Sequence, residues 1–227
     1  MIKSIIELFY PRICPGCNTV LVTAEKNICT SCNFHLPRTG HWEEKDNTIA
    51  KIFWGRVQIE NAAAYLFFQK KGRLQKIIHE IKYKNQKELG IELGRMFGNE
   101  LKKSHFSQTE LIVPVPLHPS RLKKRGYNQS EIIAKGISEA MNIPIEPNAI
   151  GRISENKSQT TKSRYERWEN VQSIFEVTKP ELLSGKHVLL VDDVLTTGAT
   201  IEACATAILK VPETKVSVAS LAYSSKN

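Results

Sequence analysis

The chain has 227 residues, of which 41% are hydrophobic and 24% are charged. This length allows one sizeable domain with a real core plus a small module, and the composition excludes a disordered or fibrous protein. The formal net charge of +9 favours anionic partners such as phosphates or nucleic acids, although a basic excess is also common on a solvated surface.

The beginning of the chain carries a short apolar stripe at helical spacing, formed by Ile2, Ile5, Ile6 and Phe9. Because Lys3 and Glu7 interrupt it and no small-residue cleavage site follows, we interpret it as an amphipathic helix and not as a secretory signal. No apolar stretch approaches the ~20 residues that span a bilayer, so we do not expect an integral membrane protein. We therefore expect a cytoplasmic chain, where paired cysteines more often bind metal than form disulfides.

Two C-x-x-C pairs follow, and eleven residues separate Cys14 and Cys17 from Cys29 and Cys32. Each tight turn directs two sulfurs at one ion, so four thiolates at this spacing predict tetrahedral zinc. A site with four cysteines leaves no open position, which indicates structural Zn²⁺ and not catalytic Zn²⁺. The alternatives are chance and a redox motif, for which one pair would suffice.

Residues 33–60 are polar without a clean period, and we interpret them as a connector. We place a boundary here between an N-terminal part, residues 1–60, and a main domain, residues 61–227. Aromatic side chains gather around this boundary at Phe53, Trp54, Tyr65, Phe67 and Phe68. Core packing is the default interpretation of these rings, and a base-sized pocket is the alternative.

Two amphipathic helices are predicted next, with a break near Asn85. Their apolar faces are formed by Leu74, Ile77, Ile78 and Ile81, and then by Leu89, Leu93 and Met96. Basic side chains surround the first helix at Lys70, Lys71, Arg73, Lys76, Lys82 and Lys84. A solvated helix face and a nucleic-acid surface both fit this charge.

Residues 110–116 predict a strand that ends at two prolines, and a basic loop follows over residues 117–127. Asn128 with Glu131 three residues later resembles a capping box, which predicts a helix start. A basic loop between a strand and a helix is typical of an anion site. Further along, residues 154–170 are long, polar and charged, which in a compact domain is typical of a lid or of disorder. Residues 174–177 then begin another strand.

Residues 188–200 are the most informative stretch. The apolar run Val188–Val191 predicts a strand that is buried on both faces, as in a parallel sheet. After Asp192 and Asp193 comes a small loop, formed by Thr196, Thr197, Gly198, Ala199 and Thr200, and then a helix in which Cys204 belongs to the apolar face. Backbone N–H groups at the helix start and threonine hydroxyls suit a phosphate monoester, and glycine lets the backbone approach the ligand.

The two carboxylates lie one step before this loop, where a sugar attached to the phosphate would lie. Ionised carboxylates only accept hydrogen bonds, so Asp192 and Asp193 suit vicinal ribose hydroxyls. The alternative is an ordinary strand–helix turn in which Asp193 or Thr197 merely caps the helix. Neither G-x-x-x-x-G-K-[ST] nor G-x-G-x-x-G occurs, which disfavours a Walker-type ATPase and a dinucleotide-binding fold.

All thirteen residues of 188–200 resemble the binding motif for 5-phospho-ribose 1-diphosphate (PRPP) in type I phosphoribosyltransferases. Val113-Pro114-Val115-Pro116, residues 125–129 and the four-cysteine module resemble the ComF family of competence-associated proteins, over residues 5 to 222. This resemblance implies an α/β fold, with a type I phosphoribosyltransferase-like, mostly parallel sheet flanked by helices and a small N-terminal zinc-binding module. The ligand would bind at the carboxyl ends of the strands.

The resemblance also implies roles for individual residues. Asp192 and Asp193 would hold the ribose and stabilise positive charge, and residues 196–200 would hold the 5′-phosphate. Residues after the proline-rich strand, namely Leu117, His118, Arg121 and Lys124, would hold the diphosphate. In the polar segment, Gln159 would contact the ligand and Arg164 would act in catalysis. Mg²⁺ would bridge diphosphate and ribose oxygens.

The implied activity is that of a pentosyl-transferring glycosyltransferase, which moves the phosphoribosyl group of PRPP to an unknown acceptor. Type I enzymes need a hood over the sheet to recognise the acceptor, and only six residues follow Leu221. We therefore expect the N-terminal part to supply the hood. The alternative is a non-catalytic protein that binds single-stranded DNA or PRPP and works with the DNA-uptake machinery in natural transformation. A purely structural adaptor would leave the acidic pair unexplained.

Overall fold

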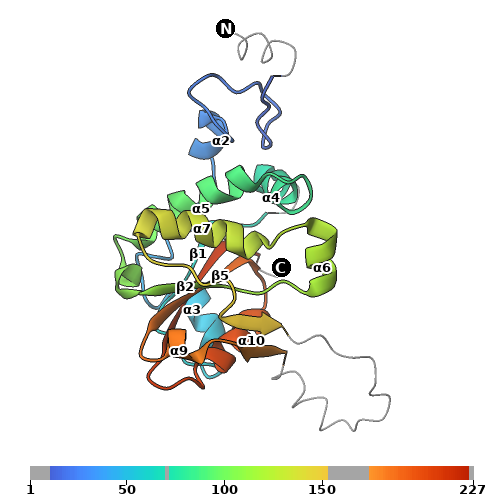
Figure 1. The fold of residues 1–227 in the computed structure, drawn as a ribbon. Coiled ribbons are helices and arrows are strands. Elements are labelled where there is room, and N and C mark those ends of the chain that lie inside the picture. The colour runs from blue at the N-terminus through green and yellow to red at the C-terminus, as the bar shows by residue number, and fades with distance from the viewer. Residues whose placement is uncertain (1–10, 70–71, 153–173, 225–227) are drawn as a thin grey trace.

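The structure is a computed structural model that describes residues 11–69, 72–152 and 174–224 (Figure 1). Its centre is a four-stranded sheet in the order β1-β6-β5-β2. All neighbouring strands pair in parallel: β1 (Ala62–Phe67), β6 (Lys215–Tyr223), β5 (His187–Leu195) and β2 (Leu111–Pro114). The expectation of a parallel sheet is therefore confirmed, and the carboxyl ends of its strands lie at one edge, where the ligand is expected to bind.

Helices cover both faces of this sheet, and each face has its own apolar core (Figure 1). On one face lie α4 (Arg73–Tyr83), α5 (Lys87–Leu101) and α7 (Gln129–Met141), and on the other lie α3 (Thr48–Phe53), α9 (Pro180–Leu183) and α10 (Ala199–Ile208). Helices α5 and α7 pack backbone to backbone, because a Cβ on Gly136 would stand 2.0 Å from the carbonyl oxygen of Ile91. The two helices therefore form one tightly packed layer over this face of the sheet.

The break predicted near Asn85 is confirmed. Asn85 has a positive φ of 56° between α4 and α5, and the apolar positions of both predicted helices are buried, apart from Met96, which is partly buried. The apolar face of α4 therefore belongs to the main core, although the helix is basic on its outer side.

Residues 33–60 are more ordered than a connector. They contain the end of α2 (Thr30–Phe34) and the whole of α3, which begins where the Asn47 side chain accepts from the amides of Ile49 and Ala50. Ile49 and Phe53 are buried under β1. A six-residue helix has fewer than two turns, so its apolar spacing is too short to show a period in the sequence.

The aromatic residues divide into two groups. Tyr65 and Phe53 are fully buried, and Tyr65 stacks on Phe97 at 5.1 Å between ring centres, so core packing is confirmed for these rings. In contrast, Trp54 is 59% exposed and Phe67 is 40% exposed.

The segment predicted as a basic loop after β2 contains a seven-residue helix, α6 (Pro119–Arg125). Pro119 takes the first helical position, where a missing N–H costs nothing, and Gly126 ends the helix at φ 78°. None of its residues is buried, so no apolar face marks this helix in the sequence.

The smaller elements complete the described chain. A short 3₁₀ turn, η1 (His105–Gln108), leads into β2, and β3 (Ile150–Arg152) pairs antiparallel with β4 (Phe175–Val177). The predicted strand at residues 174–177 therefore belongs to a separate two-stranded sheet. The stripe predicted over residues 2–9 and the lid predicted over 154–170 lie outside the described residues. None of the helices in the described ranges has the length and apolar character needed to cross a bilayer.

Candidate functional site

The acidic pair lies inside strand β5, near its carboxyl end. The sequence predicts that the strand ends before the acids, but pairing with β6 continues from Asp192 opposite Ser220 to Leu195 opposite Tyr223. Successive side chains on a strand point to opposite faces, and Leu189 and Val191 belong to the core under α4, α5 and α7. Asp193 therefore projects toward the face on which α4 ends.

Asp192 is held by two donors. Its Oδ1 accepts from the Ser130 hydroxyl at 3.0 Å and from the Asp193 amide at 2.8 Å. Ser130 lies in the first turn of α7, so the carboxylate stands near the positive end of that helix. Burial and the neighbouring Asp193 charge raise the pKa of Asp192 from 3.8 to about 7, and the two donors and Lys82 oppose this rise.

Asp193 has a different partner. Its Oδ2 lies 2.8 Å from Nζ of Lys82, in the last turn of α4, and both side chains are 19% exposed. The two adjacent carboxylates are thus held separately, one by α7 and one by α4. Sequence reasoning placed Lys82 in a general basic cluster, because nothing local shows that α4 ends beside β5.

The predicted phosphate loop follows β5 directly. Gly198 caps α10 with a φ of 80°, a conformation that other residues rarely adopt. A Cβ here would also stand 2.9 Å from Cγ2 of Ile52 and 3.1 Å from Cε1 of Phe53, so α3 packs directly under the loop. Thr196, Thr197, Ala199 and Thr200 are exposed. The loop is therefore covered by α3 on one side and is open to solvent on the other.

Arg56 also supports the loop from the side of α3, a role that no local feature of the sequence indicates. Its Nη1 donates to the carbonyl oxygen of Thr197 at 2.9 Å and to that of Ile52 at 3.1 Å, and its Nη2 pairs with Glu202 on α10. The segment interpreted as a connector therefore fixes the phosphate loop from below.

The residues expected to hold diphosphate lie on and just before α6. Leu117 and His118 are partly buried, and His118 caps the helix by accepting from the Ser120 amide. Arg121 and Lys124 are exposed on α6. In the described part of the chain, no hydrogen bond or ion pair joins these four residues to the acidic pair.

Asn128 ties the end of this segment back to the sheet. Its side chain accepts from the Ser130 amide at 3.1 Å, which confirms its capping role, and donates to the carbonyl oxygen of Val115 at 2.9 Å. Val115 in turn donates its amide to Val191 on β5. The segment therefore begins and ends at the carboxyl edge of the sheet. Gln159 and Arg164 lie outside the described residues.

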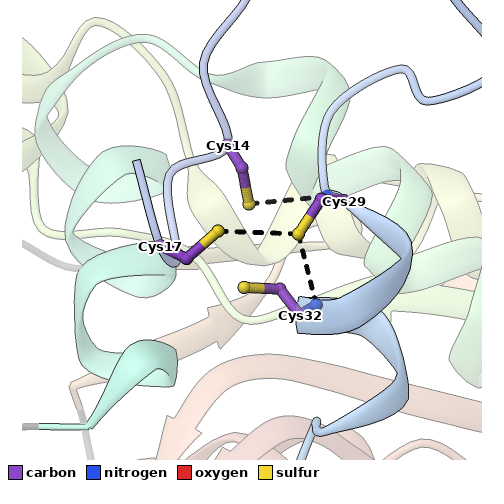
Figure 2. A group of neighbouring side chains, drawn as sticks. All are labelled: Cys14, Cys17, Cys29 and Cys32. Carbon is purple, nitrogen blue, oxygen red and sulfur yellow. Dashed lines mark hydrogen bonds between the residues drawn. The ribbon is translucent and has the colours of Figure 1, made fainter. Parts of the chain in front are cut away.

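The four cysteines form one cluster (Figure 2). The Sγ atoms of Cys14, Cys17, Cys29 and Cys32 all lie within 4.8 Å of one another. Tetrahedral Zn–S bonds of ~2.3 Å place sulfurs ~3.8 Å apart, so the cluster fits a zinc ion. Hydrogen bonds from Thr19 lower the pKa of Cys17 to about 6, which favours the thiolate that a metal needs, whereas burial raises the pKa of Cys32.

This cluster rests on α4. A Cβ on Gly16 would lie 2.8 Å from Sγ of Cys32 and 3.5 Å from Cδ1 of Ile77, and the buried cysteines share the core of α4 and α5. In Figure 1 the blue segment that carries α2 stands above α4 and α5, on the opposite side of these helices from the sheet. One helix thus contacts the cysteine cluster through Ile77 and the acidic pair through Lys82.

Comparisons with known proteins agree with this geometry. Residues 125–227 match the phosphoribosyl transferase domain family. Competence protein F of Haemophilus influenzae is 31% identical over 152 residues, which are 64% of this chain and 66% of that protein. Competence protein ComFC of Bacillus subtilis is 24% identical over 201 residues, which are 88% of this chain and 78% of that protein. The chain belongs to the ComF family.

The alignments with the first ComF relatives span about two thirds or less of the length of those proteins. DNA utilization protein YhgH of Escherichia coli is 28% identical over 60% of this chain, and the alignment spans 61% of that relative. Similar solved structures include the allosteric regulatory enzyme of purine biosynthesis, with a TM-score of 0.44 and 18% identity over 63% of this chain and 30% of that one. The parallel sheet and the matching domain family make the fold type I phosphoribosyltransferase-like.

Proposed function

We propose that this ComF-family protein binds PRPP at the carboxyl edge of its sheet and transfers the phosphoribosyl group to an acceptor. One observation carries the proposal: a carboxylate pair at the end of β5 is followed directly by an exposed loop that Gly198 caps. Helices α7 and α4 hold the two carboxylates, and α3 packs under the loop. Asp192 and Asp193 accept from the ribose hydroxyls, and the amides and hydroxyls of residues 196–200 donate to the 5′-phosphate.

In the transfer, the bond from the anomeric carbon to the diphosphate breaks and the diphosphate leaves with its electron pair. A lone pair of the acceptor forms the new bond, and the proton that the acceptor loses passes to solvent. Positive charge develops on the sugar as the bond breaks, and the two adjacent carboxylates stabilise it. Mg²⁺, whose preferred ligands are carboxylate and phosphate oxygens, would neutralise the diphosphate when bound.

The remaining roles follow the family resemblance. The partly buried and basic residues of the α6 segment, namely Leu117, His118, Arg121 and Lys124, hold the diphosphate in this proposal. Gln159 contacts the ligand, and Arg164 assists departure of the diphosphate. The four cysteines hold structural zinc, which fixes residues 14–32 against α4.

A second candidate function is binding of single-stranded DNA in partnership with DNA-uptake machinery. Relatives are named as competence and DNA utilization proteins, and α6 carries four basic residues without an acidic one. Beside it, the Tyr83 ring is 53% exposed and lies 5.4 Å from the Arg125 guanidinium. A basic surface with an exposed aromatic ring is the usual platform for stacked bases. Charge reversal at Lys123 and Lys124 should weaken DNA binding and flatten its salt dependence.

The PRPP proposal is tested by binding and by turnover. At about a hundred times its dissociation constant, PRPP with Mg²⁺ should stabilise the chain by roughly 2.7 kcal/mol, a melting shift of roughly 5–11 °C. Asp192→Asn keeps the Lys82–Asp193 pair and the side-chain shape but should lose most of the shift. Inorganic phosphate, which needs only the loop, should give the same small shift in both proteins.

Diphosphate release across a panel of acceptors then separates transfer from binding alone. Equal stabilisation of wild type and Asp192→Asn by PRPP would remove Asp192 from the ribose site and end the transferase proposal. Binding without release for any acceptor would favour the non-catalytic alternative.

A further inference from the structure

We infer that Lys82 is a further ligand-binding residue, which leaves Asp193 when ribose binds there and donates to the diphosphate of PRPP. The inference rests on the proposed function. Its basis is the 2.8 Å contact between Lys82 Nζ and Asp193 Oδ2, at side chains that are both 19% exposed. The only cation paired with the acidic couple, among the described residues, thus comes from a helix outside the motif of residues 188–200.

Lys82 lies between the acidic pair and the segment expected to hold diphosphate. The residue before it, Ile81, accepts a hydrogen bond at its carbonyl oxygen from the Tyr127 hydroxyl. The residue after it, Tyr83, lies under the guanidinium of Arg125. Arg125 is the last residue of α6 and Tyr127 lies two residues beyond it, so the end of α4 is held against the proposed diphosphate segment on both sides of Lys82.

Ribose binding at Asp193 would leave the Lys82 ammonium without its carboxylate partner. Ribose hydroxyls that donate to Asp193 compete with Lys82 for the same carboxylate oxygens. An ammonium group has three N–H donors, so Lys82 can turn to a second acceptor without leaving the site. PRPP supplies that acceptor, because its diphosphate brings several negative charges close to two carboxylates. A fixed cation there offsets the repulsion that the acidic pair would otherwise impose on the ligand.

A purely structural ion pair predicts a different behaviour. In that case Lys82 only anchors α4, and its removal alters every ligand alike or none. The two roles are separated by comparing PRPP with ribose 5-phosphate, which has the same ribose and 5′-phosphate but lacks the diphosphate.

The experiment measures the affinity of both ligands, with Mg²⁺, for wild type, Lys82→Met and Lys82→Arg. The matched control is Lys84→Met at the C-cap of α4, where the side chain is 62% exposed and pairs with Glu80 one turn earlier. Loss of one charge-assisted contact predicts a roughly ten- to hundredfold weaker PRPP affinity for Lys82→Met. Ribose 5-phosphate should bind Lys82→Met at least as well as wild type, because Asp193 has lost its competing partner.

Lys82→Arg should recover most of the PRPP affinity, and Lys84→Met should bind both ligands as wild type does. Unchanged PRPP affinity in Lys82→Met, or an equal loss for both ligands, would overturn the role of Lys82 while leaving PRPP binding itself established. A wild-type protein that does not bind PRPP would refute the proposed function, and the role of Lys82 with it.

Discussion

The guanidinium of Arg56 donates a hydrogen bond to the carbonyl oxygen of Thr197 at 2.9 Å, across 141 positions of the chain. The second nitrogen of Arg56 pairs with Glu202 on α10. The segment after α3 thus holds the predicted phosphate loop through a backbone carbonyl oxygen, and this contact does not occupy the amides and hydroxyls that are expected to bind a ligand. This contact makes the position of the loop depend on a segment far from the motif.

Arg56→Met should therefore disturb the loop without removing any ligand-binding group. We expect ribose 5-phosphate to bind about three- to tenfold more weakly, and the protein to lose about 0.5–1.5 kcal/mol of stability. Calorimetric titration and thermal melting measure the two effects. The control is Lys51→Met, since the Lys51 ammonium only lies over the Trp54 ring, and it should change neither the affinity for ribose 5-phosphate nor the stability. Wild-type affinity in Arg56→Met would show that the loop holds its shape alone.

Gly198→Ala should lower the free energy of unfolding more than an ordinary glycine substitution at positive φ does. The new Cβ would stand 2.9 Å from Ile52 and 3.1 Å from Phe53, in addition to the strain of the backbone conformation. Gly185→Ala is the matched control, since Gly185 has a φ of 70° with nothing within 4 Å of its Cβ position. We expect a loss of about 2–4 kcal/mol for Gly198→Ala and about 1–2 kcal/mol for Gly185→Ala, by urea unfolding. Equal losses would mean that α3 does not pack under the loop.

The stability of the unliganded protein should depend on pH through Asp192. Its pKa is raised from 3.8 to about 7 in the folded chain, so the folded state binds this proton more tightly than the unfolded state. The proton on Asp192 therefore stabilises the folded chain fully at pH values below 3.8, the pKa of this carboxyl in the unfolded chain. This stabilisation is lost as the pH rises toward about 7, by at most about 1.4 kcal/mol per pH unit.

Asp192→Asn cannot ionise, so it should gain stability relative to wild type as the pH rises from about 5 to about 8. Urea unfolding at several pH values measures this difference. In wild type, PRPP should also bind more tightly as the pH rises through about 7, because ribose hydroxyls need the ionised carboxylate as acceptor. Parallel stability curves for the two proteins would show that the folded environment does not shift this pKa.

The cysteine cluster should hold one zinc ion per chain. Apparent binding energies of four-cysteine sites are on the order of 10–16 kcal/mol, so Cys32→Ser should lose the metal in elemental analysis and loosen the packing on α4. Because α4 also carries Lys82, we expect the same variant to bind PRPP more weakly. Cys204→Ala is the control, since Cys204 is buried in the core of the other sheet face and should leave the zinc content unchanged. Zinc-free wild-type protein would contradict the site.

The sequence by itself determined the features whose signals are local. The apolar run before Asp192 marked the central strand, the paired cysteines marked the metal cluster, and the period of Leu74, Ile77 and Ile81 marked α4. Each of these signals comes from neighbours within a few residues of one another, so hydrophobic spacing and ligand spacing are sufficient to show them. Short elements such as α3 and α6 lack that spacing and were missed.

Only the tertiary structure decided which side chains surround the acidic pair and the loop. Ser130 reaches Asp192, Lys82 reaches Asp193 and Arg56 reaches Thr197, each from an element distant in sequence. In the sequence these three residues are ordinary helix or connector positions, because a serine, a lysine or an arginine carries no local mark of its partner. Their pairings arise because parallel strands bring their carboxyl ends to one edge of the sheet, where α4 ends and α7 begins. Contacts of this kind depend on packing, which no short stretch of sequence specifies.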